Sequence, residues 1–131
     1  MSQAKKQFER VGRHFQGVLN NRNRNLVDYE DDIWGFILNC WHFKDWIKND
    51  VEGIAKATRG KIEIEVNSYP TLMMVGELAN RSNHLQLKSS VADTGELLVL
   101  VVDKNGEELP VKKLATDAMK NWMAIIKKYR I

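Results

Sequence analysis

The chain has 131 residues, of which 44% are hydrophobic and 28% are charged, and its formal net charge is +3. These values are typical of one globular domain, so we predict a single domain over residues 1–131. The sequence shows no apolar run near the roughly 18 residues needed to span a bilayer, no secretory signal and one cysteine, Cys40, so we expect a cytoplasmic protein without membrane contact.

The first half of the chain predicts helices. Residues 3–20 have apolar positions at the spacing of an amphipathic helix, namely Phe8, Val11, Phe15, Val18 and Leu19. The asparagine-rich residues 20–25 predict a polar connection. Acidic residues at 28–32 suit the start of a second helix that runs to about Asn49. A short third helix over residues 50–58 would stop at Arg59-Gly60.

The second half mixes strands and helices. Residues 61–66 (KIEIEV) alternate charged and β-branched side chains, which predicts a half-exposed strand. A helix follows over about 70–83, with Pro70 in its first turn. Leu85 and Leu87 begin a strand, and the continuous apolar run 97–102 predicts a strand covered on both faces.

Asn105-Gly106 is the signal of a tight hairpin after that strand, and a last helix is expected over about 111–129. We therefore predict an α+β fold, in which a mostly helical bundle carries a small antiparallel hairpin or meander before the C-terminal helix.

The stretch Trp41–Trp46 places charges among large aromatic residues near the end of the second helix. At 100° per residue, Lys44 falls in the middle of a broad apolar arc and Asp45 falls within it, whereas His42 and Trp46 lie on the remaining side. Such charges are costly unless they are paired, so a compensating partner must exist. Either they bind a polar or anionic group in a cavity, or they pair locally as the helix leaves the core.

Glu77, Asn80 and His84 form a second candidate site. Their i, i+3, i+7 spacing puts them on one helical face if the helix continues to about Asn83. A carboxylate, an amide and an imidazole on one face could hold a ligand, or could position His84 as a general base. The alternative is a solvated face with no specific role.

Other chemistry finds no support in the sequence. His14, His42, His84 and Cys40 lie far apart without the spacing of a zinc site, so we predict no metal. Since a glycine-rich phosphate loop is also missing, we predict no cofactor. Cys40 points into the apolar arc, which argues against a nucleophilic thiol.

Basic residues gather at both ends of the chain. Residues 1–25 hold six basic residues against one acidic residue, and residues 112–131 do the same, so the middle is acidic. If the terminal helices lie side by side, they form a basic face that could bind nucleic acid or another polyanion. The alternative is that the basic ends only balance the acidic middle.

The pairing of Trp41–Trp46 with Ala79–Leu85 resembles a family of small, uncharacterised bacterial and phage proteins. Members share an aromatic-rich helix ending in Lys/Arg-Asp-Trp and a second helix ending in Ala-Asn-x-Ser-Lys-His-Leu. The resemblance covers roughly residues 30–90 and implies no particular activity. Because this chain has Asn83 where the pattern has Lys, an anion-binding role is not carried over to that position.

A weaker similarity is to HEPN-type helical bundles, many of which are RNases with an Arg and a His separated by four to six residues. Here Arg81 and His84 are separated by two residues, and Arg10 and His14 by three, so the nuclease motif is not met. The similarity implies at most a HEPN-like bundle with a noncatalytic role.

The favoured interpretation is a small binding module with a pocket between the two motifs, and it leaves catalysis open without assigning a catalytic residue. The expected ligand-binding residues for a polar or anionic ligand are Trp41, Lys44, Asp45, Trp46, Glu77, Asn80, Arg81 and His84. One alternative is a HEPN-related, RNA-acting enzyme of a toxin or defence system with His84 as base. Another is a structural protein that forms homo-oligomers through the aromatic helix.

Overall fold

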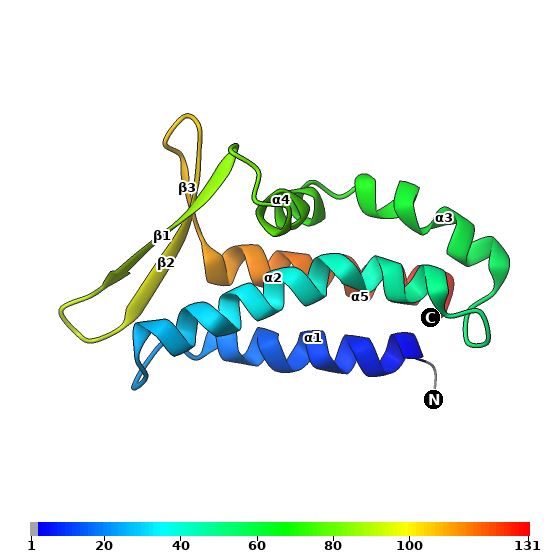
Figure 1. Cartoon of the computed structure of the whole chain (residues 1–131), viewed down its shortest axis with the longest axis horizontal. Coiled ribbons are helices and arrows are strands. Elements are labelled where there is room, and N and C mark those ends of the chain that lie inside the picture. Colours follow the sequence, from blue (N-terminus) through cyan, green and yellow to red (C-terminus); the bar gives the residue numbers. More distant parts are fainter. Residues whose placement is uncertain (1–2) are drawn as a thin grey trace.

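The fold is α+β and mostly helical, as the sequence predicts (Figure 1). The computed structural model describes residues 3–131, and within them the helices are α1 (Gln3–Leu19), α2 (Leu26–Asn49), α3 (Lys56–Asn67), α4 (Pro70–Ala79) and α5 (Val111–Tyr129). An antiparallel sheet of β1 (Leu85–Val91), β2 (Leu97–Asp103) and β3 (Glu108–Pro110) precedes α5. In this described part, no helix combines the length and the apolarity that a membrane crossing requires.

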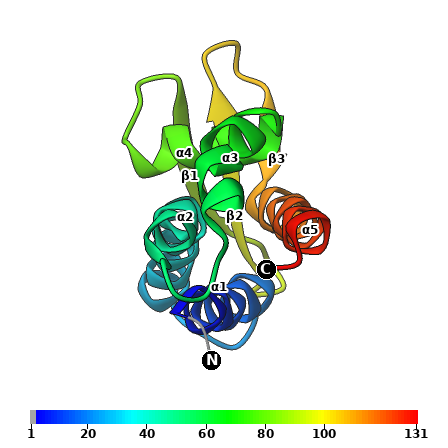
Figure 2. The same cartoon turned by 90° about the vertical axis from the view of Figure 1, so that its right-hand side faces the viewer.

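Three long helices, α1, α2 and α5, form the body of the molecule, and α3 with α4 closes the side opposite α1 (Figure 2). The sheet lies at the end where α1 stops and α2 begins (Figure 1). Aromatic pairs show that α1 and α2 run antiparallel, because Phe8 meets Phe43 at 5.2 Å between ring centroids and Phe15 meets Phe36 at 6.0 Å.

α2 is the central helix, as its broad apolar arc predicts. The side chain of Asn25 caps it by accepting a hydrogen bond from the backbone N–H of Asp28 at 2.8 Å. The side chains of α2 that the fold buries are those of Tyr29, Ile33, Phe36, Ile37, Cys40, Phe43 and Ile47. Phe43 in turn packs edge-on against Trp122 of α5, at 4.7 Å between ring centroids.

The expected strand at residues 61–66 is wrong, because these residues lie within α3. The expected helix end at Arg59-Gly60 is wrong for the same reason. Ile62 and Val66, four residues apart, are buried on one helical face, while Ile64 is 76% exposed. A strand would have put all three β-branched side chains on one face. In the helix, Ile62 and Val66 share the face that packs against the bundle, and Ile64 is left on the exposed side.

Helix α4 ends at Ala79, four residues before its expected end. The backbone N–H of Ser82 donates to the carbonyl of Glu77 at 2.9 Å, and that of Arg81 donates to the carbonyl of Leu78 at 3.1 Å. This pair of bonds is a Schellman motif, which closes a helix C-terminus. Asn80 is therefore the C-cap, and His84 lies in the turn before β1, so the expected common helical face of Glu77, Asn80 and His84 does not form.

The sheet has the strand order β1-β2-β3. Gly106, with φ of 78°, supplies the left-handed residue of the β2–β3 turn, which confirms the hairpin predicted from Asn105-Gly106. The two-sided cover expected for β2 is wrong. Val99 and Val101 are buried, but Leu98 is 40% exposed, because the helices cover one face of the sheet only.

Candidate functional site

Lys44 and Lys48 of α2 both reach Glu63 of α3. The Nζ of Lys44 donates to Oε1 of Glu63 at 2.9 Å, and the Nζ of Lys48 donates to the same oxygen at 2.5 Å. The ammonium of Lys44 also lies 4.3 Å from the ring centroid of Trp41, a cation–π contact. The hydrogen bond from Lys48, and then that from Lys44, hold the pKa of the Glu63 carboxyl below its usual range. Glu63 is therefore the compensating partner that the charge of Lys44 requires.

Asp45 is also compensated by its neighbours. Its carboxylate lies 3.2 Å from Nδ1 of His42 and 3.4 Å from Nζ of Lys48. Partial burial, the largest influence on the Asp45 carboxyl, raises its pKa, but the hydrogen bond with His42 and the nearby charges of Lys44 and Lys48 outweigh it and lower the pKa. Asp45 thus pairs within α2, whereas Lys44 and Lys48 join α2 to α3 through Glu63.

The remaining expected residues divide between different surroundings. Trp41 is half-buried and lies against α4, where a Cβ added to Gly76 would come within 2.7 Å of its ring. Trp46 is 40% exposed. Asn80 and His84 are exposed, and the turn holds His84 through its backbone N–H, which donates to Oγ of Ser82 at 3.0 Å.

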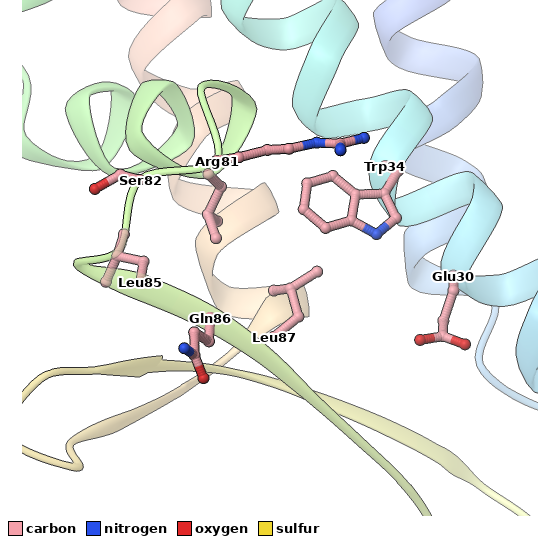
Figure 3. Close-up of a pocket in the computed structure, with 8 residues that line it drawn as sticks. Glu30, Trp34, Arg81, Ser82, Leu85, Gln86 and Leu87 are labelled. Atoms are coloured by element: carbon pink, nitrogen blue, oxygen red, sulfur yellow. The ribbon is translucent and has the colours of Figure 1, made fainter.

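Arg81 lines a groove of about 510 Å³ between the N-terminal half of α2, the turn after α4, and β1 (Figure 3). This volume is in the range of small-molecule sites in proteins. The lining residues are Glu30, Trp34, Leu78, Arg81, Ser82, Leu85, Gln86 and Leu87. The leucines make the floor apolar, and charged or polar groups surround it.

The backbone of Arg81 is in the left-handed region, with φ of 53°. This is the position of the Schellman motif that usually holds glycine, because a Cβ there clashes with the backbone. The guanidinium extends toward Trp34 (Figure 3). It makes no hydrogen bond or ion pair with any residue of the described range 3–131.

Trp34 and Glu30 form the α2 side of the groove. Trp34 is half-buried, and its indole N–H donates to no other residue in the part of the chain that the structure describes. Glu30 accepts a hydrogen bond at 3.0 Å from the hydroxyl of Ser89 in β1, which fixes the distance between α2 and the sheet. The groove thus offers a cation, an indole N–H and a carboxylate around an apolar floor.

Sequence reasoning included Arg81 but missed Trp34 and Glu30. At 100° per residue Trp34 falls in the apolar arc of the second helix, and Glu30 is one of the acidic residues that favour the helix N-terminus, so neither residue stands out in the sequence as a site residue. No local signal marks them, because their approach to Arg81 depends on how β1 passes the start of α2, where Ser89 meets Glu30.

The possible metal ligands and Cys40 are the remaining groups to place in the described part of the chain. Among residues 3–131, no group of three or more His, Cys, Asp or Glu side chains could hold a metal ion. Cys40 is fully buried, and burial raises the pKa of its thiol to about 12. Such a thiol is a core residue and not a nucleophile at neutral pH.

No family model, no curated protein and no solved structure matches the chain. The resemblance to the bacterial and phage family and the similarity to HEPN bundles therefore stay predictions.

Proposed function

We propose that the protein is a small binding module that holds a ligand in the groove between α2 and β1. Arg81 binds an anionic group of the ligand, and an apolar, planar part rests on the leucine floor beside Trp34. This proposal keeps the expected ligand class and moves the α2 side of the site from Trp41–Trp46 to Trp34.

The observation that carries the proposal is the conformation of Arg81. A left-handed backbone costs an L-residue about 1 kcal/mol, and glycine would avoid that cost at φ of 53°. An arginine here gains no ion pair within residues 3–131 in return. Backbone strain of this kind clusters at functional sites, and Arg81 combines it with a position on the lining of the groove.

Arg81→Gly tests the proposal, because it should separate stability from binding. We expect the variant to gain about 1 kcal/mol of unfolding free energy, since the strain is relieved. We also expect it to lose affinity for an aromatic anion by about tenfold or more, since a charged hydrogen bond is removed. Urea unfolding gives the first quantity. Titration with phenyl phosphate, followed by ¹H–¹⁵N spectra of the backbone and indole N–H groups, gives the second.

Arg130→Gly is the matched control. Arg130 has φ of 54° and the same charge but lies at the end of α5, so its removal should leave the titration unchanged. Benzyl alcohol, which lacks the anion, should bind wild type about tenfold more weakly than phenyl phosphate. The proposal is wrong if phenyl phosphate shifts no groove resonance at millimolar concentration, or if Arg81→Gly binds it as tightly as wild type.

A further inference from the structure

Two exposed rows of side chains run along the seam between α1 and α2. One row is cationic and comes from α1, and the other is largely aromatic and comes from α2. Together they define the α1–α2 face, whose residues are Lys6, Arg10, Arg13, Leu38, His42 and Trp46. The spacing is i, i+4, i+7 in the first row and i, i+4, i+8 in the second, so each row follows one side of its helix.

The two rows lie on the same side of the seam. Gln7 and Asn39 mark where the helices meet, because Nε2 of Gln7 donates to Oδ1 of Asn39 at 2.9 Å. At 100° per residue, Arg10 lies about 60° around α1 from Gln7, and His42 lies about 60° around α2 from Asn39. Because α1 and α2 are antiparallel, both rotations lead away from the core, where Phe8 packs on Phe43.

The charge of the face is available for a partner. Lys6 and Arg13 have no ion pair in the described residues, and Arg10 donates at 3.3 Å only to the neutral side chain of Gln7. Neither row contains a carboxylate. In contrast, two of the basic residues of α5 already have ion-pair partners, since Lys113 pairs with Asp117 and Lys128 pairs with Glu65.

The aromatic row is exposed beside these cations. Trp46 is 40% exposed and Leu38 is 42% exposed, although burial of either side chain would be favourable. The side chain of His42 is 55% exposed, and its ring is held by Asp45 at 3.2 Å. A cationic row that follows a backbone, beside flat side chains on which bases stack, is the arrangement that binds single strands.

We propose that the α1–α2 face binds single-stranded nucleic acid. The cations of α1 contact successive phosphates, and unpaired bases stack on Trp46 and His42. None of the six residues of the face lines the groove of Arg81, although Leu38 is one helical turn from Trp34, so Arg81→Gly should leave this binding unchanged. The sequence predicts a nucleic-acid-binding basic face formed by the two terminal helices, α1 and α5. The face proposed here is formed by α1 and α2 instead.

Charge reversal tests the cationic row. Fluorescence anisotropy of a labelled 20-nucleotide oligo(dT) at low salt measures the affinity. We expect Lys6→Glu with Arg13→Glu to weaken binding at least tenfold. Lys120→Glu with Lys127→Glu, which changes the net charge equally on α5, should weaken it less than threefold. Equal losses in the two double variants would show attraction by net charge alone and would overturn the proposal.

Two further measurements test how the strand is held. Three phosphate contacts predict a slope of about −2 in a plot of log K against log salt concentration, and removal of two by Lys6→Ala with Arg13→Ala should bring it near −0.7. Trp46→Ala should weaken binding at least fivefold, because base stacking is lost. Ile64→Ala, which shortens an exposed apolar side chain of α3, should not weaken binding.

A duplex of the same length should bind more weakly than the single strand, since its bases cannot stack on Trp46. Equal affinity for the duplex, or no binding of any oligonucleotide at low salt, would overturn the proposal. Sedimentation without oligonucleotide supplies another decisive result. A dimer that Trp46→Ala dissociates would assign the face to a second copy of the chain and would also overturn it.

Discussion

Glu63 holds two lysines of α2 with one carboxylate, and we predict that Glu63→Gln destabilises the fold by about 1 kcal/mol at pH 7. The expected loss is small because the Glu63 side chain is 41% exposed. The pKa of Glu63 is lowered in the folded state, so its contribution is present at neutral pH and disappears as the pH falls below about 4.3. Urea unfolding between pH 3 and pH 7 should show a steeper loss for wild type than for the variant.

Glu65→Gln is the control for that measurement, because Glu65 also lies on α3 but pairs with the exposed Lys128. It should have a smaller effect than Glu63→Gln. Parallel pH profiles for wild type and Glu63→Gln would contradict the role assigned to Glu63.

The sequence revealed the need for such a partner but not its identity. The angle of Lys44 on α2 places a charge inside an apolar arc, which is sufficient to predict a compensating partner. Glu63 could not be named, because a strand over residues 61–66 would have directed it differently. The sequence identifies Arg81 as a candidate cation, but its left-handed backbone depends on where α4 ends, and no residue type signals that end.

At the scale of the elements, α3 carries an avoidable cost. Gly60 lies inside this helix, and a Cβ added to it would meet no atom within 4 Å. We predict that Gly60→Ala raises the unfolding free energy by about 1 kcal/mol, because alanine loses less backbone entropy in a helix. Thermal and urea unfolding measure the change.

Gly76→Ala is the matched contrast in α4. Its Cβ would lie 2.7 Å from the ring of Trp41, so we expect destabilisation despite the better helix propensity of alanine. Stabilisation by both substitutions would show that Trp41 moves freely. Destabilisation by Gly60→Ala would contradict the helical assignment of residues 56–67.

A comparison of α3 with the other elements shows which parts of the fold the sequence could predict. α1, α2 and α5 each have a long apolar stripe at helical spacing, and β2 with Asn105-Gly106 has the signals of a hairpin. α3 has only two buried apolar positions, Ile62 and Val66, within a segment that alternates like a strand. Its helix is selected by contact with α2, which is tertiary information that no local pattern contains.

At the scale of the whole molecule, Asn21 joins the helices to the sheet. This residue of the α1–α2 connection is 4% exposed. Its side-chain Nδ2 donates to the backbone carbonyl of Leu97 at 2.9 Å. Its backbone carbonyl accepts from the backbone N–H of Leu97 at 2.8 Å. Its Oδ1 accepts from Nζ of Lys112 at the start of α5, at 3.2 Å. One buried amide therefore connects three segments that are distant in the sequence.

We predict that Asn21→Ala costs about 2–3 kcal/mol, because it leaves the buried carbonyl of Leu97 without its side-chain donor and removes the bond from Lys112. The β1–β2 hairpin should lose protection first, since this contact ties β2 to the helices. Hydrogen exchange of the strand amides, compared with those of α2, measures that difference. Lys112→Ala removes only the hydrogen bond from Lys112 to Asn21 and should lower the unfolding free energy by less. If Asn21→Ala left the hairpin as protected as in wild type, the sheet would depend on its packing against α4 and α5 and not on Asn21.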